Sequence, residues 1–319
     1  MITAISNNTL FLVLKSARPR QWIKNLTMYA ALVFSGLFFF APASGVPHFV
    51  TVTGAFLLFN FLTSALYIIN DILDIRADRN HPFKSKRPIA SGRLPIPVAI
   101  FAAVSFLAIV FLGSFWLSGF FRLAVLGYFL LQVLYSKVTK HVPILDVMSI
   151  AGGFVLRIYA GALVVNLHMS VWFLLTVLSA SLFLAVAKRQ SERTLLREHL
   201  GETRTTLRHY SQRLLDQYTG MFANATWLTY SLFTFQHQFV GPRTKFTELV
   251  VSLPQTLQSQ KLLMVTIPLV IFGVMRYLQL VYENDQGEAP EVIILKDKAI
   301  LSTVFALAIS VMVIIYVIG

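Results

Sequence analysis

Nine long apolar stretches constrain this chain more than any other feature of its sequence. They lie at roughly 25–41, 48–70, 97–118, 120–136, 144–165, 170–188, 217–239, 262–281 and 299–318. A run of about 20 apolar residues can cross a bilayer as a helix, because a helix satisfies its backbone hydrogen bonds internally. The pattern predicts an all-α, polytopic membrane protein with nine transmembrane helices. Residues 1–17 are expected to form an N-terminal tail, and residues 18–319 a single membrane domain.

The charges predict how the chain is oriented in the membrane. Only 13% of the residues are charged, yet the net charge is +13, and most of the 27 lysines and arginines fall in alternate loops. Because basic loops stay in the cytoplasm, we expect a multi-pass protein of the plasma (inner) membrane with its N-terminus and polar clusters inside and its C-terminus outside. The excess positive charge also suits an anionic substrate. No nucleic-acid partner is expected, since no soluble module is visible, and the absence of cysteine excludes thiol catalysis.

Three carboxylates close the second apolar stretch and form the strongest chemical signal. Asp71, Asp74 and Asp78 are spaced i, i+3 and i+7, so on a helix they share one face, which Asn70 borders. Oxygen ligands of this kind suit Mg²⁺, which shares its remaining positions with water and substrate phosphates. The alternative is a solvated helix end at the membrane surface. We predict a magnesium site at these four residues.

Cationic and polar residues near the membrane boundary are candidates for binding phosphate groups or a sugar. Arginine and lysine take phosphate oxygens through charge-assisted hydrogen bonds, and an ionisable residue inside a membrane span is a functional candidate by default. Structural ion pairs and headgroup-facing surfaces are the alternatives. The candidate substrate-binding residues are Arg18, Lys24, Asn25, Lys84, Arg87, Tyr135, Lys140, Asp146, Arg157, Lys188 and Arg189.

Several of these stretches together resemble one family. The pattern Asn70-Asp71-x-x-Asp74-x-x-x-Asp78 resembles the first aspartate-rich motif of the UbiA-type membrane prenyltransferase superfamily. The combination with 18–25, 145–157, 188–192 and 276–297 is more similar to the branch that transfers phosphoribose to a lipid phosphate. The resemblance implies a catalytic domain of nine helices around a central cavity, with Mg²⁺ as cofactor. It also implies phosphoribosyl pyrophosphate and a polyprenyl phosphate, such as decaprenyl phosphate, as substrates, and it allows a homo-oligomer.

Within this resemblance we expect Asp74, Asp78 and Lys24 to be catalytic. Enzymes that use a prenyl diphosphate carry a second aspartate-rich motif after the sixth span, whereas residues 184–215 contain no aspartate here. Direct attack of the lipid phosphate on C1 of the ribose would invert that centre. Two alternatives remain open at this point: a prenyltransferase of the same fold acting on an aromatic or quinone precursor, and a lipid-phosphate carrier without catalytic activity.

Overall fold

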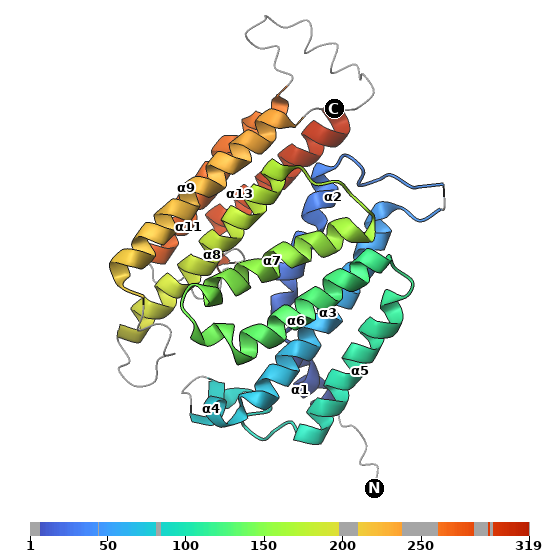
Figure 1. Cartoon of the computed structure of the whole chain (residues 1–319), viewed down its shortest axis with the longest axis vertical. Coiled ribbons are helices and arrows are strands. Elements are labelled where there is room, and N and C mark those ends of the chain that lie inside the picture. The colour runs from blue at the N-terminus through green and yellow to red at the C-terminus, as the bar shows by residue number, and fades with distance from the viewer. Residues whose placement is uncertain are drawn as a thin grey trace, which may run out of the picture. The chain divides into compact units, whose positions relative to one another are not determined.

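The structure is a computed structural model that describes residues 7–43, 45–80, 84–197, 210–237, 261–283, 293 and 296–318. Within these ranges the regular secondary structure is helical and no strand occurs (Figure 1). The predicted all-α class is therefore confirmed. Residues 1–17, expected to be a loose tail, contain helix α1 (Asn7–Ala17).

Seven helical segments in the described residues are long and apolar enough to cross a membrane. They are α3 (His48–Leu73), α5 (Ile96–Ser114), α6 (Gly119–Lys137), α7 (Leu145–Val164), α8 (Val171–Arg197), α11 (Ile267–Glu283) preceded by the 3₁₀ helix η5 (Leu262–Thr266), and α13 (Lys298–Val313) continued by the π-helix η6 (Ile314–Ile318). The predicted total of nine is not confirmed. The first predicted span, 25–41, begins inside the 3₁₀ helix η1 (Pro19–Tyr29), continues through the short α2 (Ala30–Phe34) and ends in residues without regular helix. The seventh lies in α9 (Gln212–Gln236), which is long enough but more polar.

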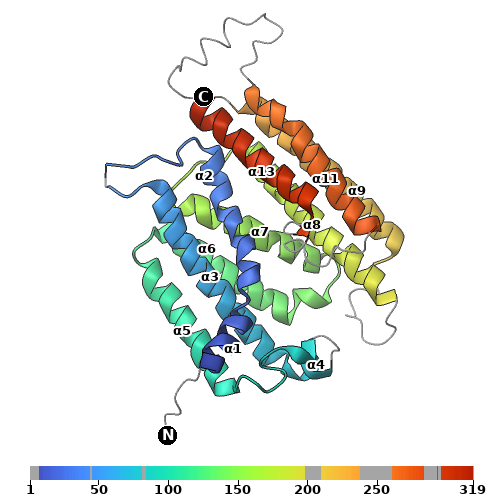
Figure 2. The same ribbon diagram turned by 180° about the vertical axis from the view of Figure 1, so that it is seen from behind.

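The chain predicted as one domain over 18–319 divides into two compact units, each of which is described by itself. The first comprises residues 1–30, 39–139 and 156–167. Its core lies where α5 packs on α3, and the small side chains of Ala99, Ala102 and Ala103 let the two helices approach closely. Ile68 of α3 and Leu12 of α1 complete this core, and Figure 2 shows the three helices α1, α3 and α5. Helix α1 is therefore anchored by burial.

The second unit comprises residues 31–38, 140–155 and 168–319. Helices α8 and α9 pack along each other, and α11 and α13 lie beside them (Figure 1). Phe183 and Tyr277 meet edge to face in its core, with ring centroids 5.4 Å apart, and Leu280 and Ile300 pack around them. These aromatic and aliphatic contacts fix the end of α8, where several candidate residues lie.

A glycine sets the closest backbone approach in the first unit. A Cβ atom added at Gly161 of α7 would overlap the backbone carbonyl of Met28 in η1. We therefore expect Gly161→Ala to destabilise the protein by about 1–3 kcal/mol, because the backbone must shift to relieve the overlap. The purified variant should show a lower thermal unfolding midpoint than the unchanged protein in the same detergent.

Gly54 in α3 provides the matched control for that substitution. A Cβ there meets nothing within 4 Å, so Gly54→Ala should leave stability unchanged or raise it by up to about 1 kcal/mol through a lower entropy cost of folding. Equal unfolding midpoints for the two variants would contradict the proposed role of Gly161 as a contact point between α7 and η1.

Candidate functional site

The predicted acidic face lies at the end of α3 and the start of the next helix. Asn70 and Asp71 lie in the last turn of α3, Asp74 is its C-cap with φ −91° and ψ 10°, and α4 (Ile75–Asn80) carries Asp78. The sequence analysis placed the three carboxylates on one helix face, whereas the structure divides them between two helices that meet at Asp74. Helical spacing nevertheless continues, because the Asp78 amide donates to the Asp74 carbonyl at 2.8 Å.

Two of the three carboxylates are buried and share one arginine. Asp71 and Asp78 are 2% and 3% exposed. Arg87 follows the 3₁₀ helix η2 (Lys84–Lys86), and its Nη1 lies 3.1 Å from Asp71 Oδ1 and 2.6 Å from Asp78 Oδ2. Buried carboxylates require such charged partners, because desolvation otherwise costs several kcal/mol per ion. The predicted basic loop thus packs directly on the predicted acidic face. His81, Pro82 and Phe83 of that loop lie outside the described residues.

Arg18 is the second cation on Asp71. It forms an ion pair with the carboxylate, and its guanidinium lies over the Tyr67 ring, 4.9 Å from the centroid. Its backbone is left-handed, with φ 53° and ψ 62°. That conformation costs a residue with a side chain of order 1–3 kcal/mol and persists where the surroundings fix it. The ion pair and the tyrosine contact fix it here, so that η1 starts against the end of α3.

The third carboxylate belongs to a polar chain that reaches α6. Asn70 Nδ2 donates to Asp74 Oδ2 at 3.0 Å, and Ser136 Oγ donates to Asn70 Oδ1 at 3.2 Å. Ser136 lies in the last turn of α6 beside the half-buried Tyr135. Ser136 therefore connects the end of α6 to the acidic residues, and Tyr135 stays a predicted substrate-binding residue.

The donor chemistry of this cluster fits a magnesium ion. Its ligands would be the carboxylates of Asp71, Asp74 and Asp78 and the amide oxygen of Asn70, all hard oxygen donors. Among the residues that the structure describes, no three His, Cys, Asp or Glu side chains are arranged to hold a metal ion. The Arg87 guanidinium supplies the positive charge between two of the carboxylates. Binding of an ion would therefore involve rearrangement of Arg87.

A buried polar network surrounds Arg157 in the same unit. The Arg157 Nε donates to Asn25 Oδ1 at 2.8 Å and its Nη2 to the Tyr128 hydroxyl at 2.6 Å. Asn25 in turn donates to Asn60 Oδ1 at 2.7 Å and to Thr63 Oγ1 at 3.2 Å. The sequence analysis identified Arg157 and Asn25 but missed the other three, although polar residues inside apolar stretches were the available signal. Lys24, the residue before Asn25 in the sequence, lies half-buried in η1.

The second unit contains a separate buried cluster. Arg189 of α8 and Asp146 of α7 are each 1% exposed, and Arg189 Nε lies 2.7 Å from Asp146 Oδ2. Arg189 also forms an ion pair with Glu192, and Lys188 Nζ lies 3.9 Å from Glu192 Oε1. Arg189 is thus engaged closely by two carboxylates, whereas the contact of Lys188 with Glu192 is long.

Tyr210 completes this cluster, and the sequence analysis missed it. Its hydroxyl donates to Asp146 Oδ1 at 2.7 Å and accepts the Ile144 amide at 2.6 Å. Burial, together with the hydrogen bond to the Asp146 carboxylate, raises the pKa of the Tyr210 hydroxyl. Ile144 has a left-handed backbone with φ 70°, which is unfavourable for a β-branched residue. The hydroxyl therefore helps to hold the strained start of α7.

Another polar cluster of the second unit links α11 to α13. Arg276 Nη2 lies 2.7 Å from Asp297 Oδ2, and Asp297 caps α13 by accepting the Ile300 amide at 2.9 Å. These hydrogen bonds, the one from Arg276 first, lower the pKa of Asp297. Pro290 and Glu291, which fall within the stretch 276–297 of the sequence analysis, lie outside the described residues. This cluster has a structural explanation as a helix cap.

The predicted site residues fall into two groups by unit. The first unit holds Arg18, Lys24, Asn25, Asn70, Asp71, Asp74, Asp78, Lys84, Arg87, Tyr135 and Arg157, and the second holds Lys140, Asp146, Lys188 and Arg189. Lys140 lies in the 3₁₀ helix η3 (Thr139–His141) and is half-buried. The structure gathers the acidic residues with Arg18 and Arg87, and it gathers Asp146 with Arg189.

Comparisons with known proteins find the same family that the sequence motifs resemble. The model of the UbiA prenyltransferase family matches residues 29–296. A decaprenyl-phosphate phosphoribosyltransferase from Corynebacterium glutamicum is 37% identical over 70% of this chain and 67% of its own length. One from Mycolicibacterium smegmatis is 32% identical over 90% of this chain and 87% of its own length.

Solved structures show the same fold. A UbiA homolog from Archaeoglobus fulgidus bound to GPP and Mg²⁺ superposes with a TM-score of 0.66 over 94% of this chain and 99% of its own, at 20% identity. The DMAPP and Mg²⁺ complex of a UbiA homolog from the same organism gives a TM-score of 0.65 at 18% identity over 94% and 98% of the two chains. At this level of identity the likeness establishes the fold alone.

Proposed function

This chain belongs to the UbiA prenyltransferase family, and we propose that it transfers 5-phosphoribose from phosphoribosyl pyrophosphate to decaprenyl phosphate. The observation that carries the proposal is the similarity, at 31–37% identity over 70–90% of the chain, to proteins named decaprenyl-phosphate phosphoribosyltransferase. The chain is accordingly a membrane-embedded transferase. The chemistry of the acidic cluster and of the cations around it supports two anionic substrates.

The reaction is a displacement at C1 of the ribose. A phosphate oxygen of the lipid forms a bond to C1, the bond from C1 to the pyrophosphate oxygen breaks, and its electron pair leaves with pyrophosphate. The attacking oxygen is already anionic near neutral pH, so no strong general base is needed. Direct attack inverts C1. The transition state resembles an oxocarbenium ion, as at other glycosyl centres, so catalysis rests on positioning and charge neutralisation.

We assign the acidic cluster to binding of the donor, phosphoribosyl pyrophosphate. Asn70, Asp71, Asp74 and Asp78 would hold Mg²⁺, which when bound neutralises charge on the departing pyrophosphate. Lys84 and Arg87 would contact donor phosphates, so Arg87 exchanges its carboxylate partners for phosphate oxygens.

We assign the other basic side chains to binding of substrate phosphates. Arg18, Lys24, Lys140, Arg157 and Lys188 would bind phosphate groups of the donor or of the acceptor. Arg189, whose charge is balanced by Asp146 and Glu192, would instead have a structural role, in which it pairs Asp146 of α7 with α8.

The aromatic prenyltransferase is the second candidate, because the family name includes prenyl transfer. Such an enzyme requires a second carboxylate cluster near the end of α8. The next aspartate along the chain is Asp216, whose carboxylate accepts hydrogen bonds from Gln190 at 2.8 Å and from Tyr282 at 3.1 Å. Asp216 is bound to these neutral donors, and Glu192 of α8 is paired with Arg189 and Lys188, which favours the phosphoribosyl transfer.

The test is a pair of assays on sealed vesicles of both orientations, prepared from the same membranes. We expect radiolabelled phosphoribosyl pyrophosphate to be consumed in inside-out vesicles supplied with decaprenyl phosphate and Mg²⁺, and not in right-side-out vesicles, because the charged donor does not cross the membrane. The inside-out vesicles should not prenylate 4-hydroxybenzoate from decaprenyl diphosphate. Aromatic prenylation without phosphoribosyl transfer would refute the proposed function, and activity only in right-side-out vesicles would refute the orientation.

A further inference from the structure

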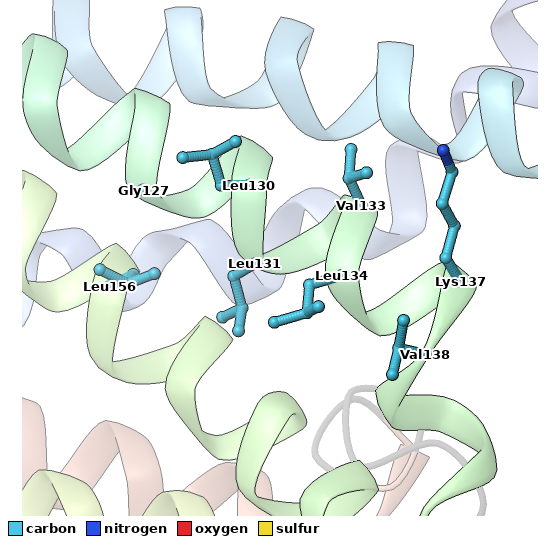
Figure 3. A pocket seen from close by; sticks show the side chains of 8 residues that line it. All are labelled: Gly127, Leu130, Leu131, Val133, Leu134, Lys137, Val138 and Leu156. Atoms are coloured by element: carbon cyan, nitrogen blue, oxygen red, sulfur yellow. The ribbon is translucent and has the colours of Figure 1, made fainter.

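An apolar groove runs along the outer face of α6 in the first unit. It has a volume of about 670 Å³ and is lined by side chains between Gly127 and Val138 and by Leu156 of α7. Figure 3 shows leucine and valine side chains along its length and Lys137 at one end. Among these lining residues, all of them in the described part of the chain, Lys137 alone is charged.

The groove follows one stripe of the helix. Gly127, Leu130, Leu134 and Lys137 recur at three- and four-residue intervals and so lie above one another. About ten residues at roughly 1.5 Å each give the stripe a length of roughly 15 Å. A Cβ at Gly127 would lie 3.9 Å from Leu156 Cδ2, so the missing side chain keeps the far end of the groove open between α6 and α7. The groove is therefore a shallow, apolar stripe along the helix, with a cation at one end.

The charged end adjoins the acidic cluster. Ser136, the residue before Lys137, donates its hydroxyl hydrogen to Asn70 Oδ1 at 3.2 Å. All of these residues belong to the first unit. The groove thus starts at the turn of α6 that contacts the candidate site and follows a membrane-spanning helix away from it. A ligand with an anionic group at one end and hydrocarbon beyond it matches this order of charge and apolar surface.

We propose that this groove binds the polyprenyl chain of the acceptor, with Lys137 contacting the lipid phosphate. The assignment rests on the proposed function, since it names where that acceptor lies. A single hydrocarbon chain fits one stripe of a helix, and within the bilayer dispersion contacts with the leucine and valine side chains would hold it there. Near the Lys137 end the groove holds the isoprene units closest to the phosphate, and near Gly127 it holds units further along the chain.

Photolabelling tests this binding without requiring turnover. Purified protein is illuminated with a polyprenyl phosphate that carries a diazirine in its second isoprene unit, and the labelled peptide is identified by mass spectrometry. We expect labelling between residues 127 and 138 that excess decaprenyl phosphate prevents and excess phosphatidylglycerol does not. Labelling that phosphatidylglycerol prevents equally would overturn the proposal, because the groove would then hold bulk lipid only.

Variants that fill the groove give the second readout. Leu134→Trp should raise the apparent KM at least tenfold for both geranyl phosphate and decaprenyl phosphate, whereas Gly127→Leu should raise it only for decaprenyl phosphate, whose longer chain reaches that end. The apparent KM for phosphoribosyl pyrophosphate should stay unchanged. Leu126→Trp is the control, because Leu126 lies on α6, is similarly exposed and does not line the groove.

The outcomes separate this inference from the proposed function. Equal KM values for Leu134→Trp, Gly127→Leu and the Leu126→Trp control would refute the groove assignment even though the unchanged enzyme transfers phosphoribose. If the unchanged enzyme transferred no phosphoribose, the proposed function would fall, and the photolabelling would still decide whether polyprenyl phosphate binds here.

Discussion

Replacing Asp74 by Asn should reduce phosphoribosyl transfer at least a hundredfold while leaving the protein folded. The amide has the same shape and its oxygen can still accept the hydrogen bond from Asn70, so little structure is lost. It removes a negative charge from the proposed Mg²⁺ ligands, and losing one preorganised electrostatic contact in an active site typically costs about 10²–10³ in kcat. Initial rates at saturating substrates, with Mg²⁺ varied, measure the effect.

Asp216→Asn is the matched control for that substitution. Asp216 contacts Gln190 and Tyr282 outside the acidic cluster, so its variant should keep near-normal activity and Mg²⁺ dependence. A readout without turnover is the Mg²⁺-dependent rise in thermal unfolding midpoint in the presence of phosphoribosyl pyrophosphate, which Asp74→Asn should diminish. Full activity of Asp74→Asn at limiting Mg²⁺ would show that Asp74 is not a ligand of the metal ion. A large loss in Asp216→Asn would favour a second metal cluster and the aromatic prenyltransferase.

The sequence predicted those parts of the fold that local pattern determines. The predicted spans 48–70, 120–136 and 144–165 agree with α3, α6 and α7 to within a few residues, because an apolar run of membrane length has few alternatives to a helix. The stretch 25–41 was predicted as a span on hydropathy alone. Its start forms a 3₁₀ helix in which Asn25 contacts Asn60 and Thr63, and contacts with another helix are invisible to a local pattern.

The same limit applies to the candidate site. Residue types and spacing identified the carboxylates and the basic residues, but not which charges pair. Arg18 meets Asp71 across 53 positions of sequence, and Tyr210 meets Asp146 across 64. Such pairings depend on how helices cross, which the sequence of either helix alone does not specify. Arg189 stays a predicted phosphate ligand, and its ion pairs with Asp146 and Glu192 add a structural explanation for its burial.

Replacing Arg189 by Met should destabilise the protein by about 3–5 kcal/mol, because it leaves the buried Asp146 carboxylate without its cation. Combining it with Asp146→Asn should restore most of the lost stability, since a buried ion pair replaced by neutral groups of similar size is often close to neutral in energy. The amide oxygen introduced by Asp146→Asn would still accept the hydrogen bond that Tyr210 donates. Unfolding in increasing SDS measures the free energies of the single and double variants.

The activity of the double variant then decides between the two roles of Arg189. If Arg189 only positions its surroundings, the stable double variant should keep a normal KM for both substrates. If Arg189 binds a substrate phosphate, the double variant should be stable but show a KM raised roughly ten- to a hundredfold, the loss of one charge-assisted hydrogen bond of about 1.5–3 kcal/mol. Lys188→Met is the matched control. Its contact with Glu192 at 3.9 Å is a helix-surface pair worth about 0.3–0.5 kcal/mol, so it should raise the KM with little change in stability.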